Sequence, residues 1–132
     1  MVRTVSQPVF PPRGAITPYR DYIGSVLELV DVHTGKLKMI HRAAEPFEAP
    51  NWTRDRVTLI YNVSGRGANR GLLHRFDLAA RTASLLDTSF ANRNNNDHVL
   101  SFDGTMLGIR HQGPETGGRS AVYVLDDMLR IQ

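Results

Sequence analysis

The sequence of 132 residues contains no cysteine, which excludes disulfide bridges, cysteine nucleophiles and thiolate metal sites. It also lacks any apolar run of about 18 residues, the minimum for a membrane-spanning helix. Residues 1–12 lack the apolar stretch of a secretory signal. We therefore expect a cytoplasmic protein with no membrane partner. The length corresponds to one domain, because single domains commonly have about 100–150 residues.

A strong excess of charge of one sign is missing as well. There are 16 lysine and arginine residues against 13 aspartate and glutamate residues, which gives a formal net charge of +3. The basic residues mostly stand singly with acidic residues between them, whereas a nucleic-acid-binding surface needs them clustered on one face. We expect no nucleic-acid partner.

Motifs for the common catalytic and metal sites are also absent. The five histidines form no His-x-x-x-His or His-Glu-x-x-His pattern, and no Gly-x-Ser-x-Gly motif is present for a hydrolase nucleophile. The glycine-rich segment 65–71 departs from a dinucleotide-binding fingerprint, because its third glycine comes one residue late. We predict no catalytic residues, no metal and no cofactor.

Hydrophobic patterning predicts strands and turns after a proline-rich start. Four prolines between positions 8 and 18 remove backbone donors, so we predict a tail over residues 1–22, with order beginning near Tyr22. Gly35 can supply the positive φ that a tight hairpin requires. Segments rich in β-branched residues predict strands at 26–32, 37–40 and 57–63.

Two sequence patterns recur at nearly the same spacing. Segment 52–61 aligns with segment 100–109, 48 residues later, matching hydroxyl with hydroxyl, Asp with Asp and Leu with Leu. Segment 30–35 aligns with segment 76–81, 46 residues later. These repeats predict a four-stranded unit whose copies stack to cover their apolar faces. The period assigns the following large residues to the core between units: Trp52, Tyr61, Phe76, Leu85, Leu107, Ile109 and Tyr123.

The repeated segments resemble those of TolB-like β-propellers. Segments 52–55 (Trp-Thr-Arg-Asp) and 100–104 (Leu-Ser-Phe-Asp-Gly) resemble the Trp-Ser-Pro-Asp-Gly-Lys hairpin of that family. Segment 30–35 resembles the turn that closes each blade. Arginines depart from the family pattern: Arg54 replaces the proline and Arg56 the glycine of the hairpin, and Ala80-Arg81 replaces the Thr-Gly of the closing turn. We expect these departures to loosen the turns without moving the strands.

This resemblance implies an all-β fold of antiparallel four-stranded blades belonging to an incomplete propeller. Dividing the roughly 110 residues after the tail by the period gives about 2.3 blades of a six-bladed ring, whereas closed propellers use typically 4–8. A truncated copy, an assembly of short chains and a half-propeller held by a partner are all compatible with this number. A free-standing antiparallel sandwich shares the same local predictions. The predicted organisation is a tail at 1–22, a partial propeller at 23–126 with repeats near 23–44, 45–90 and 91–126, and a C-terminal tail at 127–132.

The most unusual polar cluster is the run Asn94, Asn95, Asn96, Asp97 and His98. It is similar to an Asn-Asn-Asp-His segment of cytoplasmic TolB-like proteins. In propellers the loop that enters the innermost strand faces the central channel, so the resemblance places this run at a site for a small polar ligand. Glu48 and Asn51 of the equivalent loop would line the same mouth. The alternative is plain turn chemistry, because Asn and Asp side chains readily bond their own backbone.

The function that the resemblance implies is a non-catalytic module that binds a protein or a small ligand. The alternative is a fragment of a propeller enzyme, such as a carbohydrate lyase, a glycosidase or a peptidase-associated propeller. Exposed sheet edges and faces invite pairing with other chains. We therefore expect a protein partner or self-association to cover the open blade edges.

Overall fold

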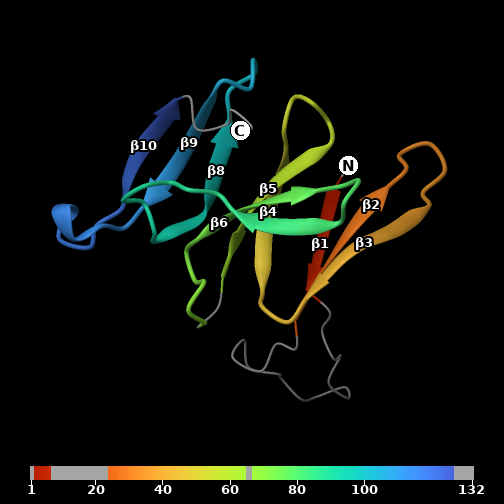
Figure 1. Cartoon of the computed structure of the whole chain (residues 1–132), viewed down its shortest axis with the longest axis horizontal. Coiled ribbons are helices and arrows are strands. Elements are labelled where there is room, and N and C mark those ends of the chain that lie inside the picture. The colour runs from red at the N-terminus through yellow and green to blue at the C-terminus, as the bar shows by residue number, and fades with distance from the viewer. Residues whose placement is uncertain (1, 7–23, 65–66, 127–132) are drawn as a thin grey trace.

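The computed structural model describes residues 2–6, 24–64 and 67–126, and these residues form β-strands and turns with almost no helix (Figure 1). A single turn of 3-10 helix, η2 (Pro114–Thr116), precedes the last strand. No helix within the described ranges has the length and apolarity to cross a membrane. The strands are β1 (Val2–Ser6), β2 (Ser25–Val30), β3 (Leu37–Ala43), β4 (Phe47–Trp52), β5 (Thr58–Val63), β6 (Leu73–Asp77), β7 (Thr82–Leu85), β8 (Asn94–Leu100), β9 (Met106–His111) and β10 (Ala121–Asp126).

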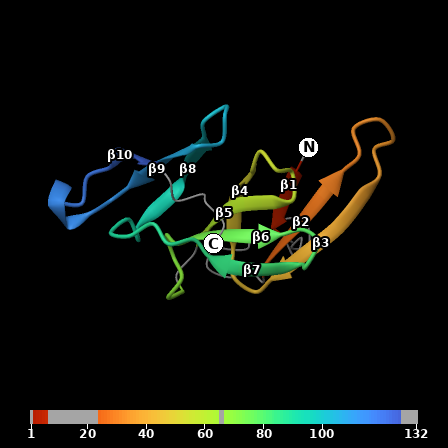
Figure 2. The ribbon, with the colours of Figure 1, turned by 45° about the horizontal axis from the view of Figure 1, so that its top comes forward.

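The strands form three antiparallel sheets that stand side by side (Figures 1 and 2). The first sheet has the order β1-β2-β3, the second β4-β5-β6-β7 and the third β8-β9-β10. The edge strands β1, β4 and β8 contact one another in turn, so they form the inner edge of the stack. The all-β prediction of stacked antiparallel sheets is confirmed, with four strands in the middle sheet and three in each flanking sheet of the described chain.

Strand β1 corrects the predicted tail. Residues Val2–Ser6 pair antiparallel with β2, from Val2 opposite Leu29 to Ser6 opposite Ser25. The prediction gave too much weight to the prolines, which begin only at Pro8 and leave the backbone donors of the preceding residues intact. The segment VRTVS is rich in β-branched residues and suits a strand once a partner is present. The remaining tail predictions, at residues 7–22 and 127–132, lie outside the described residues.

The hairpin repeat is built twice with the same hydrogen bonds. Asp55 accepts a hydrogen bond from the N–H of Val57 at 2.9 Å, and Asp103 accepts one from the N–H of Thr105 at 3.1 Å. Each carboxylate also accepts from the hydroxyl group two residues before it. The aligned side chains therefore close the β4–β5 and β8–β9 turns in the same way, as the sequence repeat predicts.

The closing turn is also built twice, with an arginine where the other copy has glycine. Asp31 and Asp77 each accept hydrogen bonds from the backbone N–H groups two and three residues later, at 2.8–2.9 Å. Gly35 has φ 69° and the aligned Arg81 has φ 57°. Arg81 keeps the left-handed conformation of the glycine that it replaces, and the turn keeps its backbone hydrogen bonds to Asp77.

We expect Arg81→Gly to raise the free energy of unfolding by about 0.5–1 kcal/mol. Left-handed backbone costs a residue with a Cβ about 1–2 kcal/mol, and the extra freedom of glycine in the unfolded chain offsets part of the gain. Urea denaturation measures the change. The converse variant Gly35→Ala should lose about 1 kcal/mol from backbone strain alone, because a Cβ there meets no atom within 4 Å. If Arg81→Gly lowered the free energy of unfolding, the claim that Arg81 strains the backbone would be wrong.

The core consists of two apolar clusters, one on each side of the middle sheet. Strand β5 supplies both, since Leu59, Tyr61 and Val63 lie in one cluster and Ile60 in the other. A strand buried on both faces has consecutive apolar residues, as Leu59, Ile60 and Tyr61 show in the middle of β5. The first cluster contains Leu27, Ile40, Phe47, Leu59, Tyr61, Val63 and Phe76. The second contains Ile60, Leu73, Leu86, Ala91, Leu107 and Ile109.

Most of the predicted core residues are confirmed, and two are wrong. Tyr61, Phe76, Leu107 and Ile109 are buried, and Tyr123 packs against the second cluster while partly exposed. Leu85 is 58% exposed, because it ends the outer edge strand β7, whose residues are all exposed. Trp52 is 37% exposed at the far end of β4. The period fixes a position within each unit, but the extent of the neighbouring sheet decides whether that position is covered.

Candidate binding site

The predicted polar run lies in a strand and not in a loop. Asn94–Leu100 form β8, in which Asn94 lies opposite His111 and His98 lies opposite Ile109. The register shifts between these two pairs, so a bulge accommodates residues that are poor strand formers. Strand β4 has a shift at the corresponding place, between Glu48 and Asn51. Pairing with β9 and β5 thus turns both predicted loops into irregular inner strands.

A polar cavity of about 580 Å³ lies at the start of these inner strands, between the second and third sheets. Three predicted site residues line it: Glu48, Asn94 and Asn95. Sequence reasoning missed the other lining residues, because they come from the end of β5, the loop before β6, the residue before β8 and the residue after β9. These residues are Asn62, Val63, Ser64, Arg70, Gly71, Arg93 and Gln112.

Asn94 is held in place by its own hydrogen bonds. Its amide nitrogen donates to the carbonyl oxygens of Gly71, at 3.0 Å, and Ala91. Gly71 has φ 81°, and a Cβ there would lie 2.9 Å from the Cα of Arg93, so this part of the wall requires glycine. The Oδ1 atoms of Asn94 and Asn62 are buried without a hydrogen-bond partner in the described residues. The wall therefore has a fixed backbone and two buried amide oxygens, those of Asn62 and Asn94, that can still accept hydrogen bonds.

His98 and Asn51 join the second and third sheets instead of lining the cavity. The amide nitrogen of Asn51 lies 3.0 Å from Nδ1 of His98 and donates to the carbonyl oxygen of His98 at 3.2 Å. With the amide in this orientation Nδ1 is an acceptor, so the imidazole is neutral. Burial lowers the pKa of His98 to about 4, and the neighbouring Asp97 carboxylate opposes that shift only in part. The pair is a buried polar contact between sheets.

Asp97 and Asn96 face away from the cavity. Asp97 forms an ion pair with Arg110 at 2.7 Å on the exposed surface, and its N–H donates to Oδ1 of Asn95 at 3.0 Å. Hydrogen bonds from Arg110 and then Asn95 hold the pKa of Asp97 below its usual value. Asn96 is exposed. The predicted run is thus divided among the cavity, the contact between sheets and the surface, and the local Asn95–Asp97 bond is the alternative turn chemistry.

The polar cavity presents groups of both charges to a ligand. Glu48 is partly buried in its wall, and the exposed Arg70 and Arg93 lie at its rim. The amides of Asn95 and Gln112 can donate or accept hydrogen bonds. Within the described part of the chain no three histidine or carboxylate side chains gather as metal ligands. This set of groups suits a small molecule with both a donor-rich and an anionic part.

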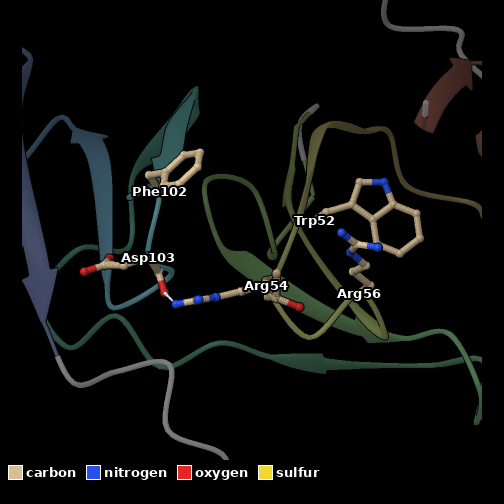
Figure 3. A pocket seen from close by; sticks show the side chains of 6 residues that line it. Trp52, Arg54, Arg56, Phe102 and Asp103 are labelled. Atoms are coloured by element: carbon tan, nitrogen blue, oxygen red, sulfur yellow. Dashed lines mark hydrogen bonds between the residues drawn. The ribbon is translucent and has the colours of Figure 1, made fainter.

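Two further surfaces lie outside the predicted site. A cleft of about 650 Å³ separates the tips of the β4–β5 and β8–β9 hairpins, and Trp52 and Phe102 line it (Figure 3). Sequence reasoning missed this cleft because it placed Trp52 in the core. The outer face of the third sheet is also open, where Val99 and Val124 lie in one row across Gly108 and are exposed.

Comparisons with known proteins agree with this architecture. No protein-family model matches the chain. An uncharacterised protein of Agrobacterium fabrum is 36% identical over 102 residues, which are 76% of this chain and 32% of that protein. A solved structure from Agrobacterium tumefaciens, provisionally described as TolB, is 35% identical with a TM-score of 0.68, over 78% of this chain and 35% of its own. TolB of Acinetobacter baumannii, at 18% identity, shows the fold alone, with a TM-score of 0.61 over 79% of this chain and 24% of its own. The chain spans about a third of the curated relative's length.

Proposed function

Because the chain is part of a TolB-like β-propeller, we propose that it is a non-catalytic binding module that takes a small polar ligand in the polar cavity. The observation that carries the proposal is the meeting of Glu48, Arg70 and Arg93 around one cavity at the inner edge of two sheets. Ligand sites commonly lie where structural units meet, and a few polar groups there fix the ligand's orientation.

The cavity offers less to the alternative of a propeller enzyme fragment. Among the described residues that line it, Glu48 is the single carboxylate, whereas most glycosidases use a pair of carboxylates. The buried His98 lies between the sheets and its hydrogen bond to Asn51 occupies Nδ1. Binding therefore accounts for these residues more directly than catalysis does.

The open sheet faces support the expectation that a protein partner or a second copy of the chain binds here. Val99, Met106, Val122 and Val124 expose apolar surface on the outer face of the third sheet. The equivalent faces inside the chain are covered by a neighbouring sheet, so this face is suited to a further sheet. We propose that a partner protein or another copy covers it, and light scattering on the purified chain distinguishes these two.

We expect cavity variants to weaken ligand binding by about tenfold or more per charged contact, which corresponds to about 1.4 kcal/mol. The probes are L-alanine, acetate, methylamine and glucose, and NMR titration of backbone amides follows each of them. We expect L-alanine, which carries both charges, to shift cavity resonances most, and Glu48→Gln and Arg93→Gln to weaken it. Asn94 is left intact because its hydrogen bonds support the wall.

The matched control for Arg93→Gln is Arg42→Gln, which also removes one positive charge, but from an exposed position on β3 outside the cavity. It should leave the titration unchanged. The proposal fails if none of the four probes moves the resonances of Glu48, Asn62 or Asn95. It also fails if the two cavity variants bind L-alanine as tightly as the control does.

A further inference from the structure

The cleft between the two repeated hairpins lies at the opposite end of the inner strands from the polar cavity. Strands β4 and β8 begin beside the cavity and end at the cleft, since Trp52 is the last residue of β4 and Phe102 follows the end of β8. We call it the aromatic cleft. It is lined by Trp52, Thr53, Arg54, Arg56, Phe102 and Asp103.

Two aromatic side chains flank this cleft and are exposed. Trp52 is 37% exposed and Phe102 is fully exposed. Figure 3 shows their rings on either side of Arg54. Exposed large aromatic residues are enriched at binding surfaces, because they supply much apolar contact area at a small cost in conformational entropy. The pair is therefore suited to enclose an apolar side chain of a partner.

The floor of the aromatic cleft is a direct contact between the hairpins. Arg54 Nη1 donates to the carbonyl oxygen of Asp103 at 3.2 Å. A Cβ at Gly104 would lie 3.0 Å from the Cβ of Arg54, so the two turns touch at this point. The contact holds the Arg54 guanidinium across the floor, with further N–H groups left to bind an anion. The cleft is thus largely formed before any partner arrives.

Arg56 adds a second cation from a strained backbone position. It has φ 62°, whereas the aligned residue in the other hairpin is Gly104 with φ 75°. Arg56 lines the same cleft as Trp52 (Figure 3). Strained residues gather at functional sites, where the side chain repays the backbone conformation. Arg56 therefore keeps the backbone conformation of glycine while placing a cationic side chain at the cleft.

The charges of the cleft favour an anionic partner of modest charge. The Asp103 carboxylate accepts hydrogen bonds from Ser101 and Thr105 of its own turn, which hold its pKa at about 2. The carboxylate of Asp55 is bonded within its turn in the same way. Both carboxylates stay ionised beside the two arginines, which disfavours the dense phosphate charge of a nucleic acid. A peptide with a few carboxylates is repelled less, because the lining residues Arg54, Arg56 and Asp103 together carry two positive charges and one negative charge.

We propose that the aromatic cleft binds an acidic peptide segment of a partner protein. In this arrangement an aromatic or large aliphatic side chain of the segment lies between Trp52 and Phe102. Carboxylates of neighbouring residues in the segment pair with Arg54 and Arg56. The proposal is independent of the polar cavity, because the two sites share no lining residue.

Trp52 is the single tryptophan of the chain, so its fluorescence reports occupancy of the cleft directly. The probe is the blocked peptide Glu-Phe-Asp-Glu, with Lys-Phe-Lys-Lys as the charge-reversed peptide and a short oligo-dT as nucleic acid. We expect saturable fluorescence change with the acidic peptide, weakened by salt. The charge-reversed peptide and oligo-dT should bind at least tenfold more weakly.

Arg56→Gly separates binding from folding. It relieves the strained turn, so the urea midpoint should rise, while binding of the acidic peptide should weaken at least tenfold. Arg81→Gly is the matched control, since Arg81 has the same backbone strain and lies outside the cleft. It should raise the midpoint and leave binding unchanged. Phe102→Ser should also weaken binding without loss of stability.

Four outcomes would overturn the proposal. The first is a fluorescence signal that the acidic peptide does not change. The second is equal affinity for the acidic and charge-reversed peptides, and the third is unchanged binding in Arg56→Gly. The fourth is tighter binding of oligo-dT, which would make the cleft a nucleic-acid surface.

Discussion

Phe76→Ala is expected to lower the free energy of unfolding by about 3–5 kcal/mol. Phe76 is fully buried on β6, in the cluster between the first and second sheets. Removing the ring loses its burial and leaves a cavity that the flanking sheets fill only in part. Domains of this size are stable by about 5–15 kcal/mol, so the variant should unfold at much lower urea concentration. Urea denaturation followed by circular dichroism measures the difference.

Leu85→Ala is the matched control for this prediction. The sequence period assigns Leu85 and Phe76 to the same core, whereas the structure leaves Leu85 58% exposed on the outer edge strand. Substitutions at exposed positions usually change stability by no more than about 0.5 kcal/mol. Similar losses in the two variants would show that β7 is covered and that the period was the better guide.

Lowering the pH from 7 to 4 is expected to cost about 3 kcal/mol of stability through His98 alone. Burial lowers the pKa of His98 from 6.5 to about 4 in the folded protein, and a tenfold change in proton affinity corresponds to about 1.4 kcal/mol. Above pH 6.5 the imidazole is neutral in both states, and its contribution to stability is fully present. Between pH 6.5 and 4 the unfolded chain binds a proton that the folded chain refuses, so stability falls.

Replacing His98 by glutamine should remove this dependence. The variant is expected to be less stable at pH 7, because the contact with Asn51 changes, but its stability should fall less steeply between pH 6.5 and 4. Burial also lowers the pKa values of His41 and His74, so part of the slope remains in the same direction. Urea denaturation at several pH values measures the slopes. His33→Gln, at an exposed turn, is the control, and an unchanged slope in His98→Gln would contradict the buried neutral imidazole.

The candidate site shows where local sequence was sufficient and where it was not. Strands β4 and β8, which hold Glu48, Asn51 and the run from Asn94 to His98, contact each other at the inner edge of two sheets, but only Glu48, Asn94 and Asn95 line the cavity. Their separate roles could not be read from sequence, because the bulges in β4 and β8 decide which side chain faces the cavity. Arg70 reaches the cavity from a loop that carries no motif, whereas Arg93 directly precedes the polar run and was adjacent to the predicted site.

The amino-acid sequence by itself determined the repeated unit, its antiparallel hairpins and its turns. Those features depend on contacts between residues close in sequence, such as the hydrogen bonds that Asp31 and Asp77 accept from the backbone N–H groups two residues later. Because the unit is repeated, the sequence shows each pattern twice. The tertiary structure alone decided that β1 joins the first sheet, that Trp52 and Leu85 are exposed, and that Asn51 bonds His98 across 47 residues. Each of these depends on which distant segment lies alongside and how far it extends, and no local pattern encodes that.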